Sequence, residues 1–235
     1  MRATLLSVFM VILSAGVLRG FDEIRFLVPE FRPYTYEKDG ALHGAGIEAI
    51  QRILKESRIP YSFVMVSGYD LAVSQTRSGN ADGFFPAVFK ADRDSFAAFS
   101  GPVIVHRWTW FLPAGSTLNP AKASFKAYAR VGTVQNSDTH AWLRKNGFRI
   151  TGIPRSPEAL PVMMGKGTIN SILLNEAVFL QSLEPGKEKP DHFRKVVLFE
   201  TPLGMYISRA YLDRNPGAME SISRAMEKLP GTGGK

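Results

Sequence analysis

Cysteine is absent from the 235 residues of the sequence. The absence excludes a disulfide-stabilised scaffold, cysteine-ligated metal sites and a thiol nucleophile. Stability must therefore come from hydrophobic packing, and this length is sufficient for one large domain or two small ones.

Long apolar runs are scarce, and the one present, residues 5–17, follows the basic residue Arg2. A bilayer span needs about 20 apolar residues, so this shorter run is typical of a secretory signal peptide. We expect residues 1–20 to be a cleaved signal peptide and the mature chain to be a soluble protein of the periplasm; a buried first strand or helix is the alternative. Residues 13–17 resemble a lipoprotein signal box, but no cysteine can carry the lipid, so we do not expect a lipoprotein.

The excess of one charge sign is modest, with 29 Lys and Arg against 21 Asp and Glu and a net charge of +8. No run of basic residues or basic helix face stands out, so we expect no nucleic-acid partner. The balance favours an anionic ligand or an anionic membrane surface.

Catalytic and metal-binding signatures are also missing. The sequence has no nucleophile elbow, phosphate-binding loop or dinucleotide fingerprint. Metal-ligand spacing is absent among the histidines, which are His43, His106, His140 and His192. We therefore expect no metal, no cofactor and no catalytic residues, and we interpret these histidines as surface or internally satisfied side chains.

What is present is an alternation of strand-like and helix-like segments, which predicts an α/β protein. The strands expected in the first half are residues 24–28, 61–66 and 81–85, and the helices are 46–57 and 71–78. The strands expected later are 130–134, 149–153 and 169–174, and the helices are 138–146, 176–183 and a last one with Asn215 as its cap.

Two extended segments, 103–112 and 196–208, are expected to cross between two lobes. Lobe 1 would comprise residues 21–112 and 198–235, and lobe 2 residues 113–197. Ligands of open α/β sheets lie beyond the carboxyl ends of the strands, and hinge closure around a solute is a known use of such a pair of lobes. We therefore expect a ligand cleft at the hinge.

Four stretches, 24–50, 77–102, 130–143 and a weaker 165–178, follow one another in a characteristic order. In the most specific stretch a strand with Gly79 and Asp82 precedes Asp92-Arg93 and then Phe-Ser-Gly-Pro at 99–102. With these stretches the chain resembles the amino-acid-type (family 3) periplasmic solute-binding proteins of ABC transporters. The resemblance implies the type II two-lobed fold, in which each lobe is a mostly parallel sheet flanked by helices. It also implies a monomer, an anionic or zwitterionic small-molecule ligand and an inner-membrane ABC permease as partner.

Arg93 is the first candidate ligand-binding residue. It lies just past a strand end, where a guanidinium can hold a carboxylate through two charge-assisted hydrogen bonds. The matching arginine of the family binds the α-carboxylate of the ligand. The alternative is a surface arginine paired with Asp92 or Asp94.

The resemblance implies further site residues. Phe31 and Tyr69 match positions of aromatic or apolar walls, although isolated aromatics are also typical of cores. Ser137 and Asp138 begin a helix that would face the cleft, where Ser137 could be only a cap and Asp138 would favour a ligand amine.

Two departures from the family narrow the ligand. Residues 85–88 contain no hydroxyl where relatives carry Ser or Thr, so Phe85 and Val88 are expected to be apolar walls. Asn175 stands where relatives carry an aspartate that pairs with the ligand ammonium, and losing a charge partner in a buried site weakens binding strongly. We therefore expect a carboxylate-bearing solute, amino-acid-like or an organic acid, with a more apolar body than an ordinary amino acid.

The leading hypothesis is a binding protein, not an enzyme, that delivers this solute to an ABC importer. One alternative is a periplasmic sensor that docks on a membrane partner. Another is a cyclohexadienyl dehydratase-like enzyme, for which Glu176 and Glu200 are the candidate proton-transfer groups. Trp108 and Trp110 share one strand face, so we expect them to pack beneath a lobe, with a position in the cleft as the alternative.

Overall fold

The computed structural model describes residues 20–183 and 189–229. The expected signal peptide lies outside the described residues apart from Gly20, and so does the glycine-rich tail 231–235. Within the described ranges, no helix is both long enough and apolar enough to cross a membrane.

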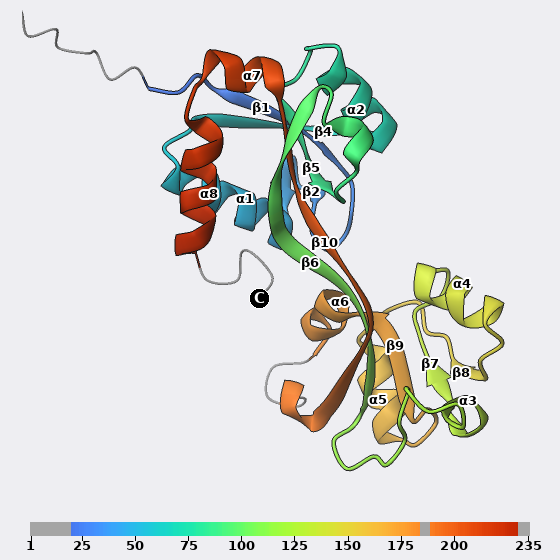
Figure 1. The fold of residues 1–235 in the computed structure, drawn as a ribbon. Coiled ribbons are helices and arrows are strands. Elements are labelled where there is room, and N and C mark those ends of the chain that lie inside the picture. Colours follow the sequence, from blue (N-terminus) through green and yellow to red (C-terminus); the bar gives the residue numbers. More distant parts are fainter. Residues whose placement is uncertain (1–19, 184–188, 230–235) are drawn as a thin grey trace, which may run out of the picture.

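The chain folds into two lobes that share one eight-stranded sheet, in the order β4-β1-β5-β10-β6-β9-β7-β8. The lobes are joined by two long antiparallel strands, β6 (Ala97–Pro113) and β10 (Phe193–Ser208), which run from one lobe into the other (Figure 1). The remaining strands of this sheet are parallel to one another within each lobe and are flanked by helices. The predicted α/β fold class is confirmed.

In the first lobe, β1 (Ile24–Pro29) lies between the parallel strands β4 (Tyr61–Val66) and β5 (Gly83–Ala87). Its helices are α1 (Ala45–Glu56), α2 (Tyr69–Arg77), α7 (Arg209–Arg214) and α8 (Ala218–Lys228). Apolar residues of α1 and α8 pack in one core with Phe26, whereas Ala72 of α2 packs with Leu27 and Phe84 in another. The sheet therefore has a helix layer on each face.

A short hairpin follows β1 and precedes α1. It consists of β2 (Tyr36–Lys38) and β3 (Ala41–His43), paired antiparallel. The turn residues Asp39 and Gly40 both have positive φ, 53° and 74°, as a tight hairpin turn requires. A 3₁₀ turn, η1 (Ala91–Arg93), follows β5.

In the second lobe, β7 (Val131–Gly132) lies between the parallel strands β8 (Ile150–Gly152) and β9 (Ser171–Asn175), and β9 pairs antiparallel with β6. Its helices are α3 (Phe125–Tyr128), α4 (Asp138–Lys145), α5 (Ala159–Gly165) and α6 (Glu176–Gln181), and a 3₁₀ turn, η2 (Pro190–His192), precedes β10. Trp110 and Leu112 of β6 pack in the core of this lobe with Val196 and Leu198 of β10. Because both long strands belong to both lobes, the lobe limits at 112/113 and 197/198 stay a proposal.

The predicted start of the last helix is wrong. Asn215 does not cap its N-terminus, because the segment forms two helices and α8 begins after Gly217, whose φ is +86°. Asn215 instead follows the end of α7, where its amide donates to the Tyr211 carbonyl (3.1 Å) and accepts from the Asp22 N–H (2.8 Å). This side chain therefore fixes the first residues of the lobe to α7.

Gly83 of the central strand β5 gives a stability prediction. An added Cβ would lie 2.7 Å from the Phe26 ring and closer still to the Tyr206 carbonyl oxygen. We expect Gly83→Ala to lower the free energy of unfolding by about 1–3 kcal/mol, because neither the strand nor the buried ring can move aside. In a domain of this size, each kcal/mol of lost stability lowers the Tm by roughly 2–4 °C.

Gly165→Ala is the matched control, because an added Cβ at this helical glycine meets nothing within 4 Å. Differential scanning calorimetry of both variants tests the prediction. An equal Tm for the two variants would contradict it.

Candidate ligand-binding cleft

Two adjoining cavities lie beside the long strands, and Phe31 and His106 border both of them. The first, of about 340 Å³, is here called the Arg93 cavity and is lined by Phe31, Tyr69, Asp70, Val73, Val88, Lys90, Arg93, His106, Thr201 and Leu203. The second, of about 330 Å³, is called the Asn175 cavity and is lined by Phe31, Arg32, His106, Trp108, Val134, Asn136, Ser137, Asp138, Thr139, Pro157, Leu174, Asn175 and Val178. The Arg93 cavity is lined by the first lobe and the long strands, whereas residues of both lobes line the Asn175 cavity. The shared residues place the two cavities side by side in one cleft.

The Arg93 side chain is only 8% exposed. Its guanidinium lies 5.2 Å from the centre of the Phe84 ring and 5.1 Å from that of Tyr206, and one nitrogen donates to the Val88 carbonyl at 3.2 Å. Among the described residues, no carboxylate forms an ion pair with Arg93, Asp92 and Asp94 included. A guanidinium has five N–H donors, so this buried cation retains donors for a ligand.

The backbone beside Arg93 is fixed by Tyr206 of β10. The Tyr206 hydroxyl accepts from the Lys90 N–H at 2.7 Å and donates to the Lys90 carbonyl at 3.1 Å. These two bonds attach the loop between β5 and η1 to strand β10, which is distant in the sequence. The position of Arg93 is therefore set by the packing of the sheet.

The other charged residues of the Arg93 cavity are Lys90 and Asp70. Together with Arg93, the lining of this cavity therefore has two cationic side chains and one carboxylate. Burial raises the pKa of Tyr69 to about 12, although the Arg93 charge opposes the shift. Tyr69 therefore stays a neutral phenol and contributes an uncharged aromatic wall.

Asn175, 8% exposed, has every hydrogen-bonding group of its side chain engaged. Its Oδ1 accepts from the Val178 N–H at 3.1 Å and caps α6. Its Nδ2 donates to the Tyr34 hydroxyl at 3.2 Å and bonds to Nδ1 of His106 at 2.9 Å. Tyr34 belongs to the first lobe and Asn175 to the second, so the side chain links the lobes.

These bonds also determine the protonation of His106. The backbone N–H of Val178 can only donate, so the amide of Asn175 must present Nδ2 to the imidazole. Nδ1 of His106 is therefore the acceptor, and the neutral ring carries its proton on Nε2. Burial lowers the pKa of His106, while the charge of Asp138 opposes this shift, so the ring is neutral at pH 7.

The lowered pKa of His106 predicts a pH dependence of stability. An unfolded histidine takes up a proton near its ordinary pKa of 6.5, whereas the folded protein resists protonation of this ring. The unfolded state thus binds more protons, and the free energy of unfolding falls as the pH drops below about 6.5. We expect His106→Gln to lose less stability than the wild type between pH 7.5 and pH 5, measured by urea unfolding; parallel losses would contradict this.

The other predicted residues of the second lobe lie at the Asn175 cavity. Ser137 caps α4 by accepting from the His140 N–H (3.2 Å), and its hydroxyl donates to the Val134 carbonyl (2.7 Å). Asp138 is exposed beside it. The structure thus brings Arg93, Phe31, Tyr69 and Val88 together in one cavity, and Ser137, Asp138 and Asn175 in the neighbouring one.

Phe85 is the exception among the predicted site residues. It is fully buried in the core beneath α1 and α8 and lines neither cavity. Successive residues of a strand face opposite sides of the sheet, so Phe84 faces the Arg93 guanidinium and Phe85 faces away from it. The sequence analysis did not identify Phe84, Lys90 and Tyr206 as residues of the site. It also did not identify His106 as a cavity residue.

The two glutamates considered for proton transfer lie outside both cavities. Glu176 pairs with Lys195 at 2.8 Å, and Glu200 pairs with Arg107 at 2.9 Å. Trp110 is buried in the core of the second lobe, whereas Trp108 also borders the Asn175 cavity. Over residues 20–183 and 189–229, no group of three or more His, Asp or Glu side chains could hold a metal ion.

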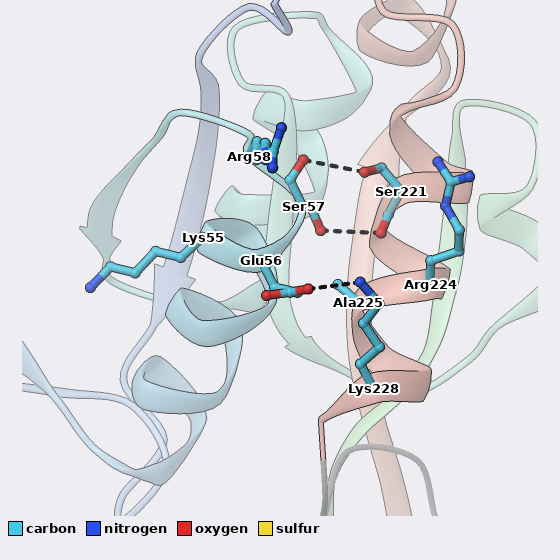
Figure 2. A pocket seen from close by; sticks show the side chains of 8 residues that line it. All are labelled: Lys55, Glu56, Ser57, Arg58, Ser221, Arg224, Ala225 and Lys228. Atoms are coloured by element: carbon cyan, nitrogen blue, oxygen red, sulfur yellow. Dashed lines mark hydrogen bonds and ion pairs between the residues drawn. The ribbon is translucent and has the colours of Figure 1, made fainter.

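A larger cavity, of about 510 Å³, lies on the first lobe between the end of α1 and α8 (Figure 2). Two bonds hold these helices together, from the Ser57 hydroxyl to the Ser221 carbonyl (3.3 Å) and from the Ser221 hydroxyl to the Ser57 carbonyl (3.2 Å). Its charged rim includes the Glu56–Lys228 pair at 3.0 Å. No residue predicted for ligand binding lines this groove, and its cations are exposed to solvent.

Comparison with known proteins gives a clear result at the level of the fold. No protein-family model and no curated protein matches the sequence. Three solved structures are similar over most of their length, each at 15% identity and each covering 88% of this chain. One is a polar amino acid ABC uptake transporter substrate-binding protein of Streptococcus thermophilus, with a TM-score of 0.68 and 80% of its own chain covered. The others are substrate-binding domain 2 of Lactococcus lactis GlnP in an open conformation (TM-score 0.60) and an ancestral cationic amino acid solute-binding protein (TM-score 0.59), each with 89% of its own chain covered.

These neighbours are binding proteins of the amino-acid class that the sequence resembles. At 15% sequence identity the similarity shows a shared fold and does not identify the ligand. The chain therefore has the two-lobed α/β fold of the amino-acid (family 3) ABC transporter substrate-binding domains.

Proposed function

We propose that this chain is an exported, periplasmic solute-binding protein that captures a small carboxylate-bearing solute in the interlobe cleft and delivers it to an inner-membrane ABC importer. The observation that carries the proposal is Arg93, a buried guanidinium with no carboxylate partner among the described residues. It lines a first-lobe cavity that adjoins the Asn175 cavity, where residues of both lobes meet. A buried cation without a partner is unfavourable, and an anionic ligand would supply that partner.

The walls of the Arg93 cavity support a solute with an apolar body. Phe31, Tyr69, Val73, Val88 and Leu203 surround the charged residues. Binding sites of this kind combine an apolar lining with a few polar groups that orient the ligand. We propose Arg93 as the carboxylate anchor, Phe31, Tyr69 and Val88 as the walls, and Ser137, Asp138 and Asn175 as the facing lobe.

Native mass spectrometry of freshly purified protein, searching for a co-purified small molecule, is the first test. A thermal-shift panel then compares carboxylic acids with their own primary amides, which keep size and shape but remove the charge. A ligand at 100 times its Kd stabilises the folded state by about 2.7 kcal/mol, so binding is readily detected. We expect the acids to stabilise and the amides not to; equal stabilisation by acid and amide would overturn the proposal.

Delivery to an importer needs its own measurement. We expect cells that lack this protein to take up the bound solute more slowly and to recover when the protein is restored. Unchanged uptake, with binding intact, would instead favour a role as a periplasmic sensor.

A further inference from the structure

The Arg93 cavity contains a second directional donor besides its cations. Nδ1 of His106 is occupied by Asn175, so the ring proton is on Nε2. The two ring nitrogens flank Cε1 and point in different directions, and His106 lines both cavities whereas Asn175 lines only its own. Within the described part of the chain, Nε2 has no hydrogen-bond partner. His106, a residue that lines both cavities, thus carries a neutral N–H donor that is not used within the described residues.

The same network leaves no acceptor for a ligand ammonium at Asn175. Both protons of its amide are donated, and its oxygen caps α6. An ammonium at Asn175 would meet the donating amide edge, and one beside Nε2 of His106 would meet another N–H donor. Asn175 and His106 therefore offer an ammonium no hydrogen-bond acceptor, and the charge that favours a cation near His106 is that of the exposed Asp138.

The remaining candidate for an ammonium partner in this cavity is Asp70. It is exposed in the first turn of α2, where the helix N-terminus already stabilises its charge. Arg93 and Lys90 outnumber it. The cavity as a whole therefore prefers an anion to a zwitterion.

From this geometry we infer that the ligand is a 2-oxo or 2-hydroxy carboxylic acid, whose carboxylate binds Arg93 and whose neighbouring carbonyl or hydroxyl oxygen accepts the Nε2–H bond of His106. This oxygen takes the position that the ammonium would hold in an amino acid. The inference rests on the proposed carboxylate-binding function and specifies its substrate class. Asn175 is a positioning residue, because it acts by fixing the tautomer of His106.

The test is a matched ligand series measured by isothermal titration calorimetry. Phenylpyruvate, phenyllactate, phenylalanine and 3-phenylpropanoate share a carboxylate and a benzyl body and differ at C2; the leucine-related series of 2-oxo, 2-hydroxy, 2-amino and unsubstituted acids repeats the comparison with an aliphatic body. We expect the oxo or hydroxy acid to bind roughly 3–10-fold more tightly than the unsubstituted acid, the effect of one good neutral hydrogen bond. The amino acid should bind most weakly.

Two variants separate a specific role from a structural one. His106→Phe keeps a ring but removes the donor, so the advantage of the oxo and hydroxy acids should disappear while the unsubstituted acid still binds. Asn175→Asp keeps an oxygen that can cap α6 but introduces a charge, and it should move the preference toward the amino acid.

The outcomes distinguish this inference from the proposed function. If Arg93-dependent binding is found but the amino acid binds most tightly, only the inference is overturned. If His106→Phe leaves the advantage of the oxo and hydroxy acids unchanged, the role of His106 is overturned. If no acid of either series binds, or if binding does not depend on Arg93, the proposed function and the inference both fail. The ranking in the wild-type protein requires no variant to fold.

Discussion

Replacing Arg93 with methionine is expected to weaken binding of a carboxylate ligand by about 30-fold or more. The side chain is buried, and the Val88 carbonyl uses only part of its donor capacity. Removing one member of a buried, hydrogen-bonded charge pair costs about 2–5 kcal/mol, because the remaining charge is left without a partner. Calorimetric titration of wild type and variant with the same acid measures the loss.

The same substitution should act on stability with the opposite sign. In the ligand-free protein the guanidinium is enclosed by Phe84 and Tyr206 without a carboxylate partner, and methionine has a similar length without the charge. Replacing buried charged groups with well-packed apolar residues of similar volume is often neutral or stabilising, by up to about 4 kcal/mol. We therefore expect Arg93→Met to unfold at a higher urea concentration than the wild type when no ligand is present.

Arg52→Met provides the control, because Arg52 is an exposed residue of α1 that lines neither cavity of the cleft. This variant should retain the wild-type affinity and stability. An Arg93→Met protein that binds as tightly as the wild type would remove Arg93 from the site. One that has lost both stability and affinity would show that Arg93 is a structural residue.

Features determined by short-range chemistry could be predicted from the sequence. The strand at 61–66 and the helix after Ser137 form as expected, because alternation, a side-chain cap and a following glycine all act within a few residues. The long strands β6 and β10 were also expected as crossings, although β6 begins at Ala97 and not at residue 103. The prediction that Asn215 caps the last helix was wrong because the helix begins after Gly217, a glycine in the left-handed conformation two residues further on.

Features that depend on distant parts of the chain could not be predicted in this way. Asn175 and His106 are 69 positions apart, and Asn175 and Tyr34 are 141 apart. Nothing near His106 in the sequence indicates that an amide will fix its tautomer. Tyr206 likewise holds the backbone of Lys90 across 116 positions. The residues that shape the Arg93 cavity are thus brought there by the sheet order.

Phe84 and Phe85 show the same limit at a single strand. The sequence indicates a buried strand but does not show which face of the strand lies toward the cleft, because Phe84 and Phe85 are both phenylalanine and point to opposite faces. Strand β5 is covered on both faces, so both side chains are fully buried. The register of β5 against β1 and β10 determines that Phe84 meets Arg93 and that Phe85 meets the α1 core.

Phe85→Ala is accordingly expected to reduce stability strongly while leaving ligand affinity unchanged. The ring is 0% exposed and packs closely on the backbone of Gly46, since an added Cβ there would lie 2.9 Å from it. Truncating a buried phenylalanine costs about 3–5 kcal/mol, through lost burial and the cavity that remains. Phe89→Ala, at a 57% exposed ring in the loop after β5, should change stability by no more than about 0.5 kcal/mol. Urea unfolding gives both values, and calorimetric titration under native conditions gives the affinities. If Phe85→Ala weakened binding while its stability stayed near that of Phe89→Ala, Phe85 would belong to the cleft after all.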